Sequence, residues 1–164
     1  MTETDDAKLI DAIRLQEEAL TLPAFDELAA HQLGERIRAL ALTRRAPVVI
    51  DIRTASRRLY FAALPGSTPD NDEWARRKGN TTLRCHAASL RVGLQFKARG
   101  YAQWPERGLD YKDYSVHGGA FPATVKGAGV VGVIAVSGLP SQDDHELVVA
   151  ALSAHLGLSG LALT

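Results

Sequence analysis

Two short apolar runs, each close to a second run of strand-forming residues, constrain the fold more than any other feature of this sequence. Residues 47–52 (PVVIDI) are rich in β-branched side chains and predict a buried strand. Residues 59–64 predict a second strand after a turn at 54–56, so the two form a β-hairpin. Residues 115–125 and 130–137 (VVGVIAVS) predict another strand pair. Hairpins build antiparallel sheets, because parallel strands need long crossover connections.

Four helices are predicted around these hairpins from apolar spacing and capping residues. Residues 5–20 and 24–44 precede the first hairpin, a long helix at about 71–98 separates the hairpins, and a helix at 141–155 follows the second. The last helix begins with Ser141 and Asp144 at the spacing of a capping box. This order predicts an α/β (α+β) fold in which helices pack on an antiparallel sheet.

Length and composition restrict the class of protein. A chain of 164 residues without repeat or linker is expected to be a single domain (1–164) with a helical N-terminal extension (1–45). Lys+Arg and Asp+Glu both number 19, and this balance excludes a globally basic nucleic-acid-binding protein. The one cysteine, Cys85, permits no internal disulfide and is interpreted as a small core residue. With no signal-peptide pattern and no apolar run of about 20 residues, we expect a cytoplasmic location and no membrane contact.

The zero net charge conceals a strongly basic middle of the chain. Residues 36–107 carry 15 basic and 5 acidic side chains, and the acidic excess lies on either side of them. Within the expected long helix, Arg77, Arg84 and Arg91 are spaced by seven and share one stripe. The stripe is either a solvated edge or a recognition surface for a small anionic ligand, because guanidinium groups bind carboxylates and phosphates in a bidentate manner.

The expected long helix also has two apolar faces. One face contains Trp74, Lys78 and Phe96, and the opposite face contains Leu90 and Leu94. A helix with two apolar faces must be covered on both sides. The second face therefore packs either on the N-terminal helices or on another subunit.

Common catalytic and metal-binding motifs are absent from the sequence. Residues 127–132 (GAGVVG) match G-x-G-x-x-G, but a strand follows where a dinucleotide site needs a helix, so a turn between strands is predicted. No nucleophile elbow or phosphate-binding loop occurs. No two histidines share the i, i+4 spacing of a helical metal site. His155 is interpreted as a partly buried core residue, whereas His117, next to two glycines, is a candidate ligand contact.

Three segments together carry a family resemblance: residues 64–78 (LPGSTPDNDEWARRK), 117–122 (HGGAFP) and 132–146 (GVIAVSGLPSQDDHE). They resemble the HbpS/GlcG-like family, often called the haem-degrading domain, and within it the branch with the longer N-terminal head. The resemblance covers about residues 15–157. It implies a profilin-like fold, homo-oligomeric assembly and, in some members, haem binding with slow haem breakdown. Lys78 matches the family's lysine-bearing helix motif and becomes a candidate pocket residue.

Two hypotheses for function follow. The first is an oligomeric small-ligand-binding protein with haem as the candidate cofactor, weak or no haem-degrading activity and no assigned catalytic residue. The candidate ligand-binding residues are Trp74, Arg77, Lys78, Arg84, His86 and His117. The basic side chains would neutralise the haem propionates, and one of the two histidines would be the axial ligand. The second hypothesis is a non-catalytic structural or partner-binding module that assembles with itself through the second apolar face of the long helix.

Overall fold

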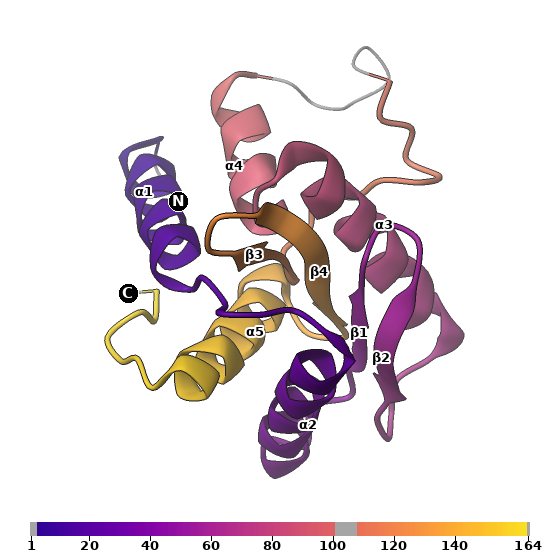
Figure 1. Ribbon diagram of the computed structural model, residues 1–164. Helices are drawn as coiled ribbons and strands as arrows, with labels where there is room; N and C mark the ends of the chain where they lie inside the picture. The colour runs from indigo at the N-terminus through magenta and orange to yellow at the C-terminus, as the bar shows by residue number, and fades with distance from the viewer. Residues whose placement is uncertain (1–2, 101–107, 164) are drawn as a thin grey trace.

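The strands of the protein form one antiparallel sheet, seen in a computed structural model that describes residues 3–100 and 108–163 (Figure 1). The strands are β1 (Val49–Arg53), β2 (Arg58–Ala63), β3 (Ala120–Val125) and β4 (Gly129–Ser137). Their order in the sheet is β2-β1-β4-β3, so the two predicted hairpins lie side by side and β1 pairs with β4. The second hairpin starts later than predicted, because residues 115–119 form a loop before β3.

Helices cover both faces of this sheet. The helices α2 (Glu27–Thr43) and α5 (Ser141–Leu156) pack side by side on one face, and α3 (Pro69–Cys85) packs on the other (Figure 1). The helices α1 (Glu3–Ala19) and α4 (Ser89–Ala98) pack on each other at the β3 end of the sheet. The predicted fold class, an antiparallel sheet with packed helices in a single domain, is confirmed.

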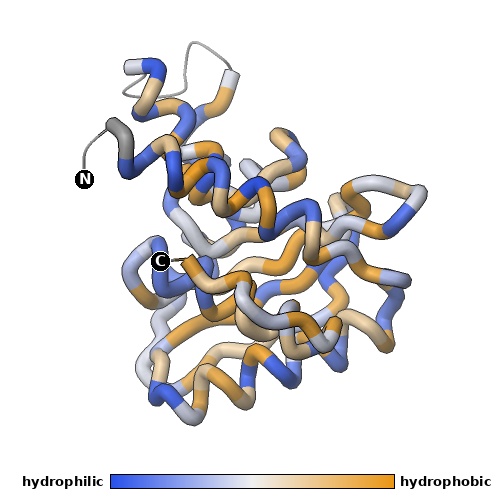
Figure 2. Tube along the Cα trace, turned by 90° about the vertical axis from the view of Figure 1, so that its left-hand side faces the viewer, coloured by the Kyte–Doolittle hydropathy of each residue, from blue (hydrophilic) through white to orange (hydrophobic). Residues whose placement is uncertain are grey.

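The buried hydrophobic residues form a separate core on each face of the sheet. Figure 2 shows hydrophobic residues concentrated in the central strands and hydrophilic residues on the outer sides of the helices. The larger core lies between the sheet, α2 and α5, and contains Ile37, Ile50, Ile134 and Leu152. The core under α3 is made of small side chains such as Ala75 and lets this helix approach the sheet closely.

The predicted long helix is wrong, because the chain breaks between α3 and α4. His86 ends α3 in the left-handed conformation (φ 52°, ψ 41°), and its N–H donates to the Thr82 carbonyl. Ala88 then precedes α4, and its N–H donates to Glu17 Oε1 of α1 at 2.7 Å. The apolar spacing continues through the break, which is marked by the left-handed backbone of His86 and by the tertiary hydrogen bond from Ala88 to Glu17.

The break also overturns two interpretations that depended on one helix. Arg91 belongs to α4 and forms an ion pair with Glu17 at 2.7 Å, so the three arginines do not form a single stripe. Leu90 and Leu94, expected on a second apolar face, pack into the main core of the same chain. Cys85 at the end of α3 is exposed rather than a core residue.

Thr68 begins α3 with Pro69 at the first helical position, and the Thr68 N–H donates to the Asn71 side chain. Two local predictions are confirmed. The glycine motif forms the turn between β3 and β4, with positive φ at Gly127 and Gly129. His155 is partly buried. Residues 101–107 lie outside the described part of the chain. Among the described helices, none is long and apolar enough to cross a membrane.

Candidate functional site

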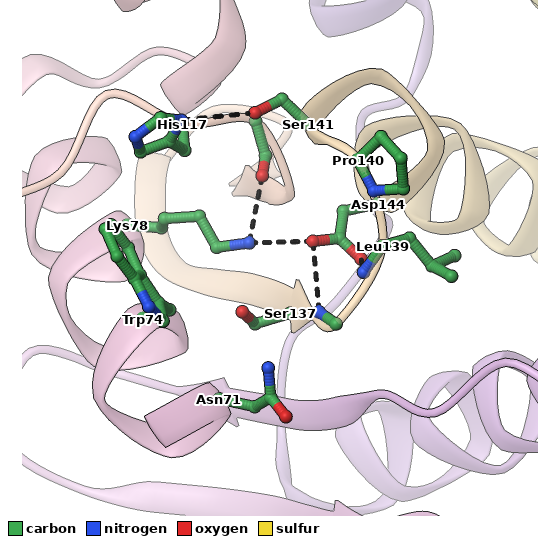
Figure 3. Close-up of a pocket in the computed structure, with 11 residues that line it drawn as sticks. Asn71, Trp74, Lys78, His117, Ser137, Leu139, Pro140, Ser141 and Asp144 are labelled. Carbon is green, nitrogen blue, oxygen red and sulfur yellow. Dashed lines mark hydrogen bonds and ion pairs between the residues drawn. The ribbon is translucent and has the colours of Figure 1, made fainter. Parts of the chain in front are cut away.

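A pocket of roughly 350 Å³ opens between the first half of α3 and the start of α5 (Figure 3). Its wall comes from three regions that are far apart in the sequence: the first turns of α3, the loop before β3, and the loop from β4 into α5. The residues that line it are Asn71, Trp74, Lys78, His117, Gly118, Ser137, Gly138, Leu139, Pro140, Ser141 and Asp144. We call this the α3–α5 pocket.

A buried ion pair forms the floor of the α3–α5 pocket. The Lys78 ammonium donates to Asp144 Oδ2 at 3.0 Å and to the Gly118 carbonyl at 2.9 Å (Figure 3). It also donates to the Val136 carbonyl at 2.7 Å. Both charged side chains are almost fully buried. An ammonium has three N–H groups, so these three acceptors satisfy it completely. Lys78 therefore joins α3 to the loop before β3, to β4 and to α5.

Asp144 receives two further hydrogen bonds from the loop that precedes α5. The backbone N–H of Leu139 donates to Oδ1 at 3.0 Å, and that of Gly138 to Oδ2 at 3.2 Å. Burial raises the pKa of Asp144, although Lys78 and both N–H groups oppose the shift. Burial likewise lowers the pKa of Lys78, against the attraction of Asp144. Desolvation thus outweighs the attraction for each group, and the pair holds the loop in place at an energetic cost.

Two glycines make this close assembly possible. A Cβ on Gly119, whose φ is +123°, would come within 2.3 Å of the Val136 carbonyl oxygen and 2.7 Å of Lys78 Nζ. A Cβ on Gly118 would come within 2.2 Å of the Ser141 carbonyl oxygen. The glycine pair in HGG therefore lets the loop before β3 contact both β4 and α5.

His117 stands at the mouth of the pocket against the Trp74 ring. The two rings meet edge to face, with centroids 5.2 Å apart. Ser141 Oγ lies 3.4 Å from His117 Nδ1 and orients the imidazole (Figure 3). Burial, followed by the positive charges of Lys78 and Arg77, lowers the pKa of His117, so the ring is neutral at pH 7. The direction of this contact depends on the ring tautomer; in the tautomer with the proton on Nδ1, the ring donates to Ser141 and Nε2 is left as an electron-pair donor.

A smaller hollow of roughly 210 Å³ lies on the other side of the Trp74–His117 pair. Arg77 lines it, with its guanidinium 4.1 Å from the centre of the Trp74 ring. The Arg77 hydrogen bonds, to the carbonyls of Glu73 and Tyr111, are both long at 3.4 Å. Arg77 is therefore a cation that can turn toward an anionic group at this site.

The other two candidate residues lie outside these hollows. Arg84 stacks 5.4 Å from the Tyr114 ring and donates to the Gly108 carbonyl at 3.1 Å. His86 is exposed and directly follows α3. It lies eight residues beyond Lys78, which corresponds to about 12 Å along the helix axis. In the described part of the chain, no group of three or more His, Cys, Asp or Glu side chains can hold a metal ion.

Comparison with known proteins shows which family this chain belongs to. The model of the family described as "Haem degrading protein HbpS-like" matches residues 25–153. The chain belongs to this HbpS-like family. The matched range begins just before α2 and includes every residue of the α3–α5 pocket. A UPF0303 protein of Mesorhizobium japonicum is 48% identical over 165 residues, covering 99% of this chain and 97% of its own length.

Solved structures show the same architecture. The crystal structure of Ybr137w protein is 28% identical, with a TM-score of 0.82 over 92% of this chain and 90% of its own. The crystal structure of HbpS is 25% identical, with a TM-score of 0.65 over 84% of this chain and 93% of its own. The HbpS-like family and its fold, predicted from three sequence segments, are therefore confirmed.

Sequence reasoning missed several residues of the α3–α5 pocket. Asp144 was interpreted as a capping residue, yet α5 has no side-chain cap and Asp144 binds Lys78 instead. Asn71, Ser137 and Ser141 were not candidates, although each lines the pocket. The sequence signal that could have identified Ser137, Ser141 and Asp144 is the segment VSGLPSQDDHE, because this segment forms the pocket wall from Ser137 to Asp144.

Proposed function

We propose that this HbpS-like protein binds a small anionic ligand between the α3–α5 pocket and the hollow beside Arg77, and that haem is the ligand. The observation that supports the proposal most directly is the neutral imidazole of His117, oriented by Ser141 at the point where the two hollows meet. The description of the family, "Haem degrading protein HbpS-like", names haem. Ligand pockets in general are mostly apolar and contain a few placed polar groups, and haem suits a pocket of this kind.

The residues present fit a haem group. A neutral histidine with one free ring nitrogen is a common protein ligand of haem iron, and the lowered pKa of His117 favours the neutral ring. Trp74 would offer an aromatic surface to the macrocycle, and Arg77 would neutralise a propionate. Lys78 would support the pocket from below, because its three N–H groups are already used within the chain. When bound, haem would supply redox chemistry that none of the protein side chains offers.

The test is a haem titration of the purified protein followed by absorption. We expect a Soret band at stoichiometric haem in the wild type and in His86→Ala, and a weaker or shifted band in His117→Ala. His86→Ala is the matched control, because that histidine is exposed and outside both hollows. No spectral change in the wild type would overturn haem binding. An unchanged band in His117→Ala would overturn the axial role of His117.

We also propose that the protein assembles with copies of itself. The face expected for this, around Leu90 and Leu94, is buried within the chain, so assembly needs another surface. Leu28 and Leu42 are exposed on one side of α2, and the adjacent β2 is an edge strand with unpaired backbone groups. Light scattering at micromolar concentration is expected to show an oligomer that a Leu28→Glu, Leu42→Glu double variant dissociates. A monomeric wild type would refute this proposal.

A further inference from the structure

A separate hollow of roughly 370 Å³ lies where the turn between β1 and β2 meets α3. It shares no lining residue with the α3–α5 pocket or the hollow beside Arg77. Figure 1 shows the β1–β2 turn beside α3, and a hydrogen bond of 2.7 Å from Arg53 Nη2 to Asn80 Oδ1 joins the two. The residues that line it are Asp51, Arg53, Thr54, Ala55, Ser56, Arg57, Arg58, Arg76 and Asn80. We call it the hairpin hollow.

Two of the four arginines in the hairpin hollow are neutralised from outside it. Arg57 forms an ion pair with Glu27 of α2 at 2.7 Å. Arg76 binds Glu73 and Asp113, each at 3.1 Å. These two guanidiniums therefore contribute little uncompensated charge.

The other two arginines share a single carboxylate. Arg58 Nε donates to Asp51 Oδ1 at 2.9 Å, and Arg53 Nε lies 3.7 Å from Asp51 Oδ2. One negative charge thus faces two positive charges, and one positive charge is left without a counterion. The Asp51 side chain is buried, and 15% of the Arg53 side chain is exposed against 52% of the Arg58 side chain, so water screens the excess charge less at Arg53 than at Arg58.

The hydrogen-bond donors of these two arginines are only partly used. Arg58 uses Nε and Nη2 for Asp51, and Arg53 uses Nη2 for Asn80 and the Arg76 carbonyl. Within residues 3–100 and 108–163, the Nη1 groups of Arg53 and Arg58 find no acceptor. Burial lowers the pKa of Arg53, and the positive charges of Arg58 and Arg76 lower it further against the opposing effect of Asp51. A bound anion would relieve this repulsion.

We propose that the hairpin hollow is a second ligand site, which binds a phosphate group between the Nη1 donors of Arg53 and Arg58. Two guanidiniums from neighbouring strands present separate donor edges, and a phosphate has enough terminal oxygens to meet both. The group can belong to inorganic phosphate or to a small phosphomonoester. The site lies within the basic middle of the chain and shares no charged side chain with the α3–α5 pocket. It is independent of haem binding.

The experiment is a titration of the ¹⁵N-labelled protein with inorganic phosphate, and separately with glycerol 3-phosphate, at constant ionic strength in chloride. Backbone amide shifts of Ser56 and Arg57 report occupancy of the hollow. We expect saturable shifts there, and about tenfold weaker binding in Arg58→Gln, which loses a charge-assisted donor. Asp51→Asn removes the competing carboxylate and is expected to bind phosphate several-fold more tightly. Arg38→Gln is the matched control, since Arg38 is an exposed arginine paired with Glu35 elsewhere.

Binding of either ligand with this pattern supports the site, and tighter binding of glycerol 3-phosphate identifies a phosphomonoester as the preferred form. Equal binding in the wild type and Arg58→Gln, shifts spread over the whole surface, or no saturation would overturn it. Arg57→Gln is a second variant with low risk to folding, and it is expected to leave phosphate binding nearly unchanged, because Glu27 already neutralises Arg57. Circular dichroism confirms that each variant is folded.

Discussion

Replacing Lys78 with methionine tests whether the buried ion pair holds the α3–α5 pocket together. Methionine keeps an unbranched side chain that is one atom shorter than that of lysine, and it removes the ammonium. Asp144 and the carbonyls of Gly118 and Val136 would then lose a donor while remaining buried. Breaking a buried pair by removing one partner costs about 3–5 kcal/mol, and the 2% exposure of Lys78 allows no rescue by solvent. We therefore expect the free energy of unfolding to fall by about 4 kcal/mol.

Equilibrium unfolding in urea measures this change. With a slope of about 2 kcal/mol per molar urea, the midpoint is expected to fall by about 2 M in Lys78→Met. Lys126→Met is the control, because Lys126 is exposed in the turn between β3 and β4 and its loss is expected to cost less than about 0.5 kcal/mol.

A second variant separates the charge from the packing. Asp144→Asn keeps an oxygen that can accept from Leu139 and removes the buried negative charge. The double variant Lys78→Met, Asp144→Asn is therefore expected to recover about 1–2 kcal/mol relative to Lys78→Met alone. A midpoint change below about 0.5 M in Lys78→Met, or a double variant whose loss equals the sum of the single losses, would refute this reasoning.

Two further predictions concern pH and backbone. Burial lowers the pKa of His145 to about 4, below its unfolded value of about 6.5, so the unfolded state takes up a proton first as the pH falls. Stability is expected to decrease by up to about 1.4 kcal/mol per pH unit between 6.5 and 4, and urea midpoints should show a smaller slope in His145→Gln. Gly119→Ala is expected to cost more than about 3 kcal/mol, because its Cβ would overlap Val136 O, whereas Gly127→Ala, with open space around it, should cost about 1–2 kcal/mol. Thermal unfolding compares the two, and equal losses would contradict the proposed close approach at Gly119.

The break between α3 and α4 illustrates why sequence periodicity failed where it did. Apolar residues keep helical spacing from Leu83 to Leu94, so a single helix satisfied every local criterion. After the left-handed His86, the N–H of Ala88 bonds to Glu17 of α1, 71 residues earlier in the chain. A local pattern contains no information about such a partner.

The candidate site shows the same division. His117 and Trp74 were identified from their neighbours in the sequence, and both line the α3–α5 pocket. Asp144 was assigned to a helix cap, because its spacing from Ser141 was the only local explanation of a carboxylate there. Its actual partner, Lys78, lies 66 residues away and is reached only when α3 and α5 meet at the end of β4.

The sequence by itself determined the hairpins, the position of α5 and the family, because these depend on local propensity and on contiguous motifs. Only the tertiary structure decided which charges meet. It joined Lys78 to Asp144 under one pocket and placed Arg53 and Arg58 around Asp51 in another hollow. The physical reason is that burial makes the energy of a charge depend on its spatial neighbours, and these come from distant parts of the chain.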